Sequence, residues 1–446
     1  MRGINSLRSS LVLPLSAQFE AARLYSETLG SASADIMRSR QLESLRRIWR
    51  DCVSDVPYYR DIVARGLAPR EIGSWEEFHA IPVLDRNMFQ QNASQFRRIS
   101  GPPDRYLSTA GSTGQPVQFG EWKRESKPLR VAKLVPWIRH GYTIDSRLVV
   151  IWGHAHLLGT GWRRHYNHAV RKAKDWVAGY HRIDAYTIDR AKAARIAEDI
   201  IRLRPAGLIG YSAVLDLFCR YTPHYHAALR TAGLKFVMPC AEPAPRPDTF
   251  DLLRSTFGCP VIQEFGGVDF GHVGFKVDDR QHTLFPELNI LEAEASPGGV
   301  KGVPAVVTTL YPRYVPLIRY RQGDMITGIV RDELGLVVTF DSIEGRINDM
   351  ITLHDGGSVH SLALTHCFKE EREIFNVQLL LRDQGPLFSL VVKEPLSDPV
   401  ERAIRIRLGQ LHPEFAKAEF SYVSDLEANR AGKRRWIVDR RREKID

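Results

Sequence analysis

The spacing of hydrophobic residues predicts alternating helices and strands over much of the first 280 residues. Apolar residues recur with helical spacing over 36–52 and again over 193–201, where Pro205 stops the pattern. A short apolar stretch, AGLIGY (206–211), follows as a strand, and another helix begins at Ser212. Helix, strand, loop and helix in this order are typical of βαβ units.

The pattern changes after about residue 284. Extended apolar segments separated by turn residues dominate until 344, and helices nearly vanish. From 349 a smaller unit is predicted, with a short helix, strands near 374–381 and 387–393, and a helix that Asp398 caps and Pro399 opens. We therefore expect an α/β protein with a large N-terminal region of mixed sheets and flanking helices (1–347) and a small α+β C-terminal domain (348–446).

Composition agrees with a folded protein of more than one domain. The chain has 446 residues, of which 43% are hydrophobic and 26% charged. Its net charge of +10 is concentrated in 161–174 and 432–444. No nucleic-acid-binding motif accompanies these stretches, so a solvated basic face or a phosphate-bearing ligand remain as explanations and nucleic acid is not expected.

Cysteines and apolar runs indicate the compartment. The five cysteines are scattered without a Cys-x-x-Cys pair, which favours buried thiols in a reducing environment over a structural metal. No apolar run reaches the roughly 18 residues that a membrane span needs. The N-terminal apolar stretch is broken by Pro14, and we interpret it as an N-terminal arm of a cytoplasmic protein.

The segment LSTAGSTGQP (107–116) combines two glycines with several hydroxyl side chains. Such a loop can wrap a phosphate, because glycine lets backbone N–H groups turn inward and hydroxyls add donors without bulk. It lacks the lysine of a Walker P-loop, and Gln115 stands where a basic residue is expected. Alone, the segment is equally consistent with a plain surface loop.

Five later segments follow this loop in a fixed order: GYSAVLDLFCRY (210–221), IQEFGGVDFG (262–271), PLIRYRQGDMI (316–326), IEGRINDMITLHDGGSVH (343–360) and ANRAGKRRWIV (428–438). With them the chain, from about residue 40 to its end, resembles the adenylate-forming ligase superfamily. The similarity is greatest to the branch of phenylacetate-CoA ligases, capsule-biosynthesis adenylate-forming proteins and indoleacetate-lysine ligase.

The resemblance implies that a carboxylic acid and ATP form an acyl-adenylate and pyrophosphate, and that the acyl group then passes to coenzyme A or an amine. Such a reaction needs bound phosphates, an in-line carboxylate and stabilised negative charge, and hence Mg²⁺ as well as ATP. The resemblance assigns nucleotide binding to these residues: Ser108, Gly111, Ser112, Thr113, Gly114, Glu242, Phe265, Gly266 and Asp324.

Individual roles follow from the same resemblance. Phe265 matches the aromatic residue that stacks on adenine, and Asp269 matches the magnesium ligand. Asp324 matches the acceptor for both ribose hydroxyls. The predicted catalytic residues are Arg346, near the ribose and phosphate, and Lys433, which touches the carboxylate and α-phosphate during adenylation.

Further expectations concern the second half-reaction and the acid. The small domain is expected to rotate about Asn348, which withdraws the C-terminal lysine. The resemblance implies that Glu242 lies in a stretch beside the adenine. The acid pocket is assigned to aromatic and histidine side chains, although the histidines are equally well explained as packed at a strand end: Trp152, His154, His156 and Tyr211.

Departures from the family pattern keep other functions open. The family reads aromatic-Gly-Ser/Thr-Thr-Glu where this chain has Phe265-Gly266-Gly267-Val268-Asp269, so the threonine hydroxyl is missing and the acid is shorter. Core packing of Phe265, a turn role for Asp269 and a surface role for Lys433 are the structural alternatives. Adenylyl transfer to a hydroxyl and a non-catalytic adenylate-binding protein are the functional alternatives. The oligomeric state is open, with a homodimer among the alternatives.

Overall fold

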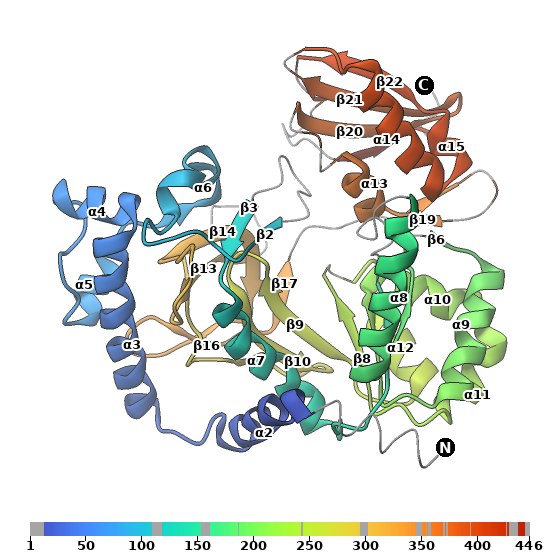
Figure 1. The fold of residues 1–446 in the computed structure, drawn as a ribbon. Helices are drawn as coiled ribbons and strands as arrows, with labels where there is room; N and C mark the ends of the chain where they lie inside the picture. The colour runs from blue at the N-terminus through green and yellow to red at the C-terminus, as the bar shows by residue number, and fades with distance from the viewer. Residues whose placement is uncertain are drawn as a thin grey trace.

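The computed structural model describes most of the 446-residue chain. The residues described are 13–108, 118–152, 161–185, 187–241, 244–294, 302–344, 350–353, 355, 358–368, 371, 373–392, 394–424, 426–427 and 436–441. They form an N-terminal helical layer, a parallel-sheet body, a body of mixed sheets and a C-terminal body (Figure 1).

The N-terminal layer contains the predicted helix of 36–52, which extends over α3 (Ala34–Asp55). Its buried face carries Leu45, Ile48 and Trp49, so the apolar spacing correctly located the core side. The predicted N-terminal arm is also helical from residue 13, because Pro14 falls in the first turn, where a missing N–H costs nothing. The helices of this layer are α2 (Leu13–Thr28), α3, α4 (Pro57–Ala64), α5 (Trp75–His79) and α6 (Arg86–Gln91).

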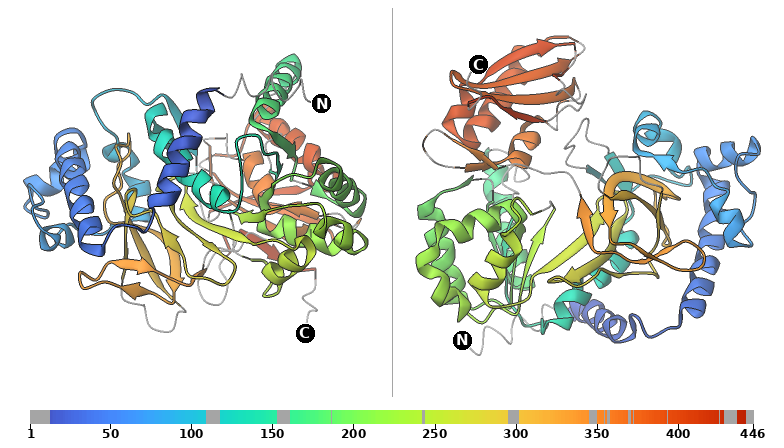
Figure 2. Two further views of the ribbon diagram at one scale, coloured as in Figure 1. Left: turned by 90° about the horizontal axis from the view of Figure 1, so that it is seen from below. Right: turned by 180° about the vertical axis from the view of Figure 1, so that it is seen from behind.

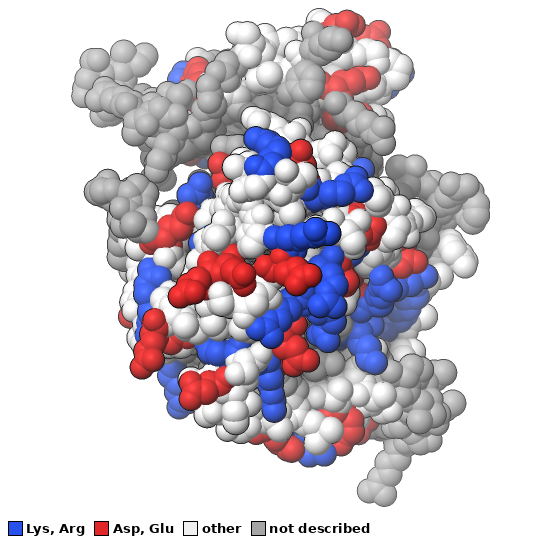
Figure 3. Space-filling view, turned by 90° about the vertical axis from the view of Figure 1, so that its left-hand side faces the viewer, with Lys and Arg blue, Asp and Glu red and all other residues white. Residues whose placement is uncertain are grey.

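Acidic and basic side chains are interspersed on the face that α3 to α5 present (Figure 3). Two ion pairs illustrate the mixture: Arg65–Asp61 at 3.2 Å on the surface and Arg38–Asp332 at 2.6 Å, which ties α3 to a turn of the mixed-sheet body. The net positive charge of the chain therefore does not make this face uniformly basic.

The parallel-sheet body confirms the βαβ prediction. Four parallel strands are ordered β5-β4-β7-β8, and AGLIGY supplies the central strand β7, whose residues are all buried. The strands are β4 (Leu148–Ile151), β5 (Tyr180–Ile183), β7 (Gly207–Tyr211) and β8 (Phe236–Cys240). The helices are α8 (Gly161–Ala178), α9 (Arg190–Leu203), α10 (Ser212–Tyr221), α11 (His226–Arg230) and α12 (Thr249–Phe257).

The mixed-sheet body contains the extended segments predicted after residue 284. Strand β14 lies between β1, with which it is parallel, and β13, with which it is antiparallel, and β9, β10 and β11 form a neighbouring antiparallel sheet. The strands before residue 280 are β1 (Leu84–Asp85), β2 (Arg105–Ser108), β3 (Gln118–Glu121), β9 (Ile262–Gly267) and β10 (Gly271–Val277). The later strands are β11 (Thr283–Leu284), β12 (Asn289–Ala293), β13 (Val303–Thr309), β14 (Tyr320–Thr327), β15 (Val330–Arg331), β16 (Val337–Thr339) and β17 (Ser342–Glu344), and helix α7 is Ser126–Arg139.

The C-terminal body is a four-stranded sheet in the order β22-β21-β20-β23 with helices against it. It lies above the parallel-sheet body in Figure 1 and in the right-hand view of Figure 2. The cap of its long helix corrects our prediction: Ser397 is the N-cap, so Asp398 and Pro399 are the first two helical residues. Its elements are β18 (Met350–Thr352), β19 (Ser358–His360), α13 (Ser361–Phe368), β20 (Ile374–Arg382), β21 (Gly385–Val392), α14 (Asp398–Leu411), α15 (Pro413–Ala416), β22 (Glu419–Val423) and β23 (Ile437–Asp439).

One short sheet joins the C-terminal body to the rest. Strand β19 pairs with β18 and with β6 (Thr187–Ile188), which follows the edge strand of the parallel sheet. The domain boundary predicted near 348 lies in 345–349, outside the described residues.

Candidate functional site

The hairpin of β9 and β10 positions Asp269 at its tip. Its loop is Val268–Phe270, and Gly271 follows with φ of +77°, a conformation that favours glycine. A Cβ at Gly267 would lie 2.5 Å from Oδ1 of Asp269, and one at Gly266 would lie 2.7 Å from the carbonyl oxygen of Gly271. Gly267 therefore leaves room for the carboxylate of Asp269, and Gly266 lets the backbone of β10 approach β9 closely.

Buried ionic contacts hold this tip in place. The Arg313 guanidinium donates to the carbonyl oxygen of Asp269, and its Nε lies 3.3 Å from Glu125 Oε2. Glu125 also accepts from the backbone N–H of Tyr314 at 2.8 Å. The side chains of Arg313 and Glu125 are 4% and 1% exposed, so each charge depends on the other inside the protein.

The electrostatics of Asp269 show which charges surround it. Burial raises the pKa of the Asp269 carboxyl, and the nearby charge of Asp324 raises it further, while Arg86 and Arg313 act in the opposite direction. Asp269 is only 5% exposed. Two predicted site residues, Asp269 and Asp324, are therefore close enough to interact although 55 positions separate them in the chain.

A bulge in β14 places Asp324. Pro304 and Val306 of β13 pair with Met325 and Arg321 of β14, so three residues of β14 lie opposite Ala305 alone. Gly323, in the middle of the bulge, has φ of +107°. Bulges re-aim side chains next to binding sites, and this one leaves Asp324 half-buried.

One hydrophobic cluster connects the three segments that carry the predicted nucleotide site. Phe119 of β3, Phe265 of β9 and Tyr320 of β14 belong to it. The rings of Phe89 and Phe119 stack at 5.1 Å, and the Tyr320 ring lies 5.8 Å from Phe89. The β2–β3 hairpin, which leads into and out of the predicted phosphate loop, is thus anchored beside β9 and β14.

Phe265 itself does not present a surface for adenine. Its side chain is 2% exposed, with the rings of Phe270 and Phe340 at 5.7 and 5.6 Å. Stacking on a base requires an open ring face, so the core interpretation of Phe265 agrees with the structure and the adenine-stacking prediction does not. Gly266 and Val268, by contrast, are exposed at the hairpin.

Two residues of the predicted acid pocket lie together at the carboxyl edge of the parallel sheet. Trp152 follows β4, Tyr211 ends β7, and their rings stack at 4.4 Å with an interplanar angle of 29°. In open α/β sheets this edge is where ligands bind. Tyr211 is 3% exposed, so Trp152 covers it from the loop side.

Many predicted site residues lie outside the described residues. Ser108 ends β2, opposite Gln118, at the start of the predicted phosphate loop. Those not described are Gly111, Ser112, Thr113, Gly114, Gln115, His154, His156, Glu242, Arg346, Asn348 and Lys433. Their roles remain predictions.

Sequence reasoning missed Arg86, Arg313 and Glu125. Arg313, in LYPRYVP (310–316), stands among apolar and aromatic positions, and that setting was the available signal for it. Arg86 in LDRN (84–87) and Glu125 in KRES (123–126) have polar neighbours, so the sequence held no such signal for them. The sequence does not display their tertiary relations: Arg313 donates to Asp269, Glu125 pairs with Arg313, and the charge of Arg86 acts on Asp269.

Within the described residues no helix is long and apolar enough to cross a membrane, and no group of three or more His, Cys, Asp or Glu side chains is arranged to hold a metal ion. All five cysteines are free thiols, and burial raises the pKa of Cys52 to about 12.

The architecture over most of the chain is that of a solved CoA ligase. The structure of 2-hydroxyisobutyryl-CoA ligase with 2-HIB-AMP and CoA in the thioesterification state has a TM-score of 0.58 at 16% identity, covering 93% of this chain and 92% of that chain. The same ligase in the postadenylation state with R3-HIB-AMP gives 0.54 at 16% identity, covering 90% and 89%. An open conformation with 2-HIB-AMP and CoA gives 0.52 at 16% identity, covering 90% of each chain.

No protein-family model matches the sequence, and none of the curated proteins searched matches it. At 16% identity the structural likeness shows the fold. The predicted fold class, a large mixed α/β region followed by a small α+β domain in the manner of adenylate-forming ligases, is thereby confirmed.

Proposed function

We propose that the protein activates a small carboxylic acid with ATP as an acyl-adenylate, releases pyrophosphate, and transfers the acyl group to coenzyme A. One observation carries the proposal. Over 93% of its length the chain has the fold of a ligase whose structure holds an acyl-AMP and CoA, so the match includes the large N-terminal region and the C-terminal body. The proximity of Asp269 and Asp324, far apart in sequence, supports it. An amine acceptor and an aromatic acid, as in the phenylacetate-CoA ligase branch, are the finer alternatives.

Each described residue receives a role from its position. Asp324 accepts hydrogen bonds from the ribose hydroxyls, since a carboxylate offers acceptors only. Arg86 supplies positive charge near the phosphates, where Gln115 does not. Arg313 acts on Asp269 through the backbone and positions the hairpin. Trp152, which is half-buried and stacks on the buried ring of Tyr211, provides the aromatic surface for the acid.

The donor set fits magnesium. Mg²⁺ binds through one or two carboxylates together with substrate phosphates and retains several waters, so Asp269 alone is a sufficient protein ligand. Burial raises the pKa of Asp269, which means that its ionised form gains from a nearby cation. When bound, Mg²⁺ would neutralise charge on the phosphates.

The C-terminal body is proposed to move between the two half-reactions about Asn348. Pairing of Val359 with Thr187 docks it on the parallel-sheet body in this structure. Among the three states of the ligase compared, the TM-score is highest for the thioesterification state, in support of a docked arrangement for the second step. Lys433 is proposed to enter the site only during adenylation.

The test is exchange of labelled pyrophosphate into ATP with a panel of acids that includes 2-hydroxyisobutyrate and phenylacetate. We expect exchange with at least one acid, and a CoA thioester in the mass spectrum when coenzyme A is added. If no thioester forms but an added amine yields an amide, the acceptor is an amine and not coenzyme A. No exchange with any acid would contradict the proposal, and an AMP-modified hydroxyl product would establish adenylyl transfer in its place.

A further inference from the structure

Helix α8 lies in front of the parallel sheet in the view of Figure 1, and the edge strand β5 follows it in the chain. A surface helix normally turns its apolar stripe toward the core and its polar side toward water. The described side chains of α8 show the opposite arrangement. The proposed ligase reaction does not use this helix.

Apolar side chains form the exposed side of α8. Tyr166 is 63% exposed and Trp176 is 47% exposed. Ala169 and Ala173 are also exposed and lie between them in the chain. Because the four positions follow the spacing i, i+3, i+7 and i+10, they form one row along the helix, roughly 15 Å long at 1.5 Å per residue. We call these four residues the α8 row.

The side of α8 that faces the protein is polar. The Arg182 guanidinium of β5 donates two hydrogen bonds to the Asp175 carboxylate, both at 3.1 Å, and the Asp175 side chain is 16% exposed. Nη1 of Arg171 is buried as well. Arg171 and Asp175 are four positions apart, so they share one side of the helix, opposite the α8 row. A charge pair thus holds this side of the helix on β5, and the apolar row is turned outward.

Positive charge flanks the α8 row. Among the side chains of α8 that the structure describes, the exposed charges are Lys172 and Lys174, one on each side of the row. The acidic residue of this helix, Asp175, is the one bound to Arg182. The basic segment 161–174 contains no Asp or Glu. The outward side of α8 therefore combines apolar side chains with positive charge.

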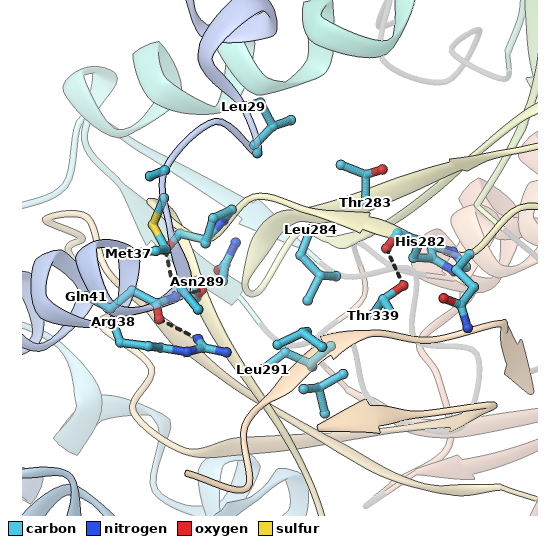
Figure 4. Close-up of a pocket in the computed structure, with 17 residues that line it drawn as sticks. Leu29, Met37, Arg38, Gln41, His282, Thr283, Leu284, Asn289, Leu291 and Thr339 are labelled. Atoms are coloured by element: carbon cyan, nitrogen blue, oxygen red, sulfur yellow. Dashed lines mark hydrogen bonds between the residues drawn. The ribbon is translucent and has the colours of Figure 1, made fainter. Parts of the chain in front are cut away.

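The α8 row is separate from the cavity shown in Figure 4. That cavity of about 530 Å³ lies between the start of α3, the β10–β11 turn and β16, and no residue of α8 lines it. A small ligand is usually enclosed by its pocket on most sides. The outward side of a helix is better covered by a broad surface.

The apolar row and its flanking lysines select that surface. A second copy of the same face would bring lysines against lysines, and like charges across an interface are unfavourable. The phosphates of a nucleic acid would pair with the lysines but would not cover the apolar row. A bilayer with acidic lipids supplies acyl chains for the row and anionic headgroups for the lysines, and Trp and Tyr side chains are enriched at this boundary.

We propose that α8 binds the surface of a bilayer that contains anionic phospholipid. The helix lies parallel to the surface, with the rings of Tyr166 and Trp176 at the boundary of headgroups and acyl chains and with Lys172 and Lys174 at the lipid phosphates. The proposal rests on the surface of α8 and does not depend on the proposed ligase reaction.

The test is flotation of the full chain with vesicles of one part phosphatidylglycerol to three parts phosphatidylcholine, compared with vesicles of phosphatidylcholine alone. We expect the chain to float with the anionic vesicles, to bind the neutral ones about tenfold more weakly, and to bind less as salt rises and screens the lysines. No flotation with anionic vesicles, or equal flotation with the two compositions, would overturn the proposal.

One pair of double variants tests the apolar row. Tyr166→Ser/Trp176→Ser removes both rings, whereas the control Leu24→Ser/Ile406→Ser removes two side chains of similar exposure, 54% and 55%, from α2 and α14. We expect the first variant to bind anionic vesicles more than about tenfold more weakly, because it has no ring to bury, and the control to bind as the unmodified chain does. Melting curves by circular dichroism establish that each variant is folded. Undiminished vesicle binding by folded Tyr166→Ser/Trp176→Ser would overturn the proposal.

A second pair tests the flanking charge. Lys172→Gln/Lys174→Gln removes two positive charges beside the row, and the control Arg47→Gln/Arg50→Gln removes two from exposed positions of α3. We expect the first variant alone to lower the partition coefficient on anionic vesicles, by about 25-fold, or about fivefold for each charge. An equal effect of the two variants would show that net charge and not α8 determines binding, and would overturn the proposal.

Other occupants of the row give different results. A dimer in sedimentation equilibrium that Tyr166→Ser/Trp176→Ser dissociates, without flotation of the unmodified chain, would assign the row to a second copy. Binding of a polyglutamate peptide without flotation would assign it to an acidic protein. Either result would overturn the lipid proposal.

Discussion

Replacing Asp324 by asparagine tests the nucleotide site at one atom. The change keeps the shape of the side chain at the β14 bulge and removes its charge. A hydrogen bond to a charged group contributes about 1.5–3 kcal/mol and a neutral one about 0.5–1.5 kcal/mol. With two ribose hydroxyls as donors, we expect a loss of about 1–3 kcal/mol, or roughly 5- to 150-fold in the Kd for ATP.

The assay is calorimetric titration with ATP in the absence of acid, so that no turnover disturbs the equilibrium. Glu333→Gln is the control, because Glu333 is an exposed acid of the β15–β16 turn in the same body. Equal ATP affinity in Asp324→Asn and in the unmodified protein would refute the ribose assignment and, with it, the main support for this site.

The same variant has a consequence for stability as a function of pH. Burial raises the pKa of Asp269 above its value in the unfolded chain, and Asp324 raises it further. The stability linked to this group is therefore complete below the unfolded pKa and is lost as pH rises through the folded pKa. Asp324→Asn lowers the folded pKa of Asp269, so we expect a smaller loss of Tm with rising pH in nucleotide-free protein. An identical Tm profile would show that the two carboxyl groups do not interact.

Two further variants address the chemistry. Lys433→Ala is expected to abolish pyrophosphate exchange, because the C-terminal lysine is assigned to adenylation alone. A preformed acyl-adenylate should still be consumed by this variant. Unchanged exchange would remove Lys433 from the mechanism. Val268→Thr restores the family's hydroxyl at an exposed position of the hairpin loop. We expect this variant to exchange pyrophosphate faster in steady-state assays. An unaltered rate would mean that the hydroxyl does not reach the α-phosphate.

The succession of elements was readable from the sequence because local patterns encode it. The helical spacing around Leu45 and Ile48 and the apolar run of β7 correspond to buried faces in the structure. The error occurred at a helix boundary, where Ser397 and not Asp398 is the N-cap of α14. The position of such a boundary depends on the backbone conformation of one residue, to which apolar periodicity is insensitive.

The site was predictable in part. The resemblance assigned Asp269 and Asp324 to one nucleotide and magnesium site, and in the structure the charge of Asp324 acts on Asp269, while their roles stay predictions. The burial of Phe265 was not predictable, because an aromatic residue on a strand fits a core and a binding surface equally well until Phe270 and Phe340 are placed around it. The role of Arg313 depends on contacts with segments distant in sequence and was likewise hidden.

Arg86 offers a test of how the chain manages without a basic residue in its phosphate loop. Strand β1 pairs in parallel with β14, with Asp85 opposite Arg321, and this pairing places the start of α6 beside the Asp324 bulge. Arg321 is already bound to Glu294 at 2.7 Å, whereas the charge of Arg86 acts on Asp269. Arg86 is therefore the described cation that we assign to the phosphates in place of Gln115.

We expect Arg86→Ala to weaken ATP binding about 10- to 150-fold, the range for losing a charge-assisted hydrogen bond, and to affect AMP binding much less, because AMP lacks the β- and γ-phosphates. Arg86→Lys should restore part of the affinity, since it keeps the charge but not the fork of donors. Arg60→Ala, at an exposed arginine of α4, is the control. If Arg86→Ala weakened the binding of AMP and ATP equally, Arg86 would contact the α-phosphate or stabilise the fold. Another residue would then have to supply the positive charge that Gln115 lacks.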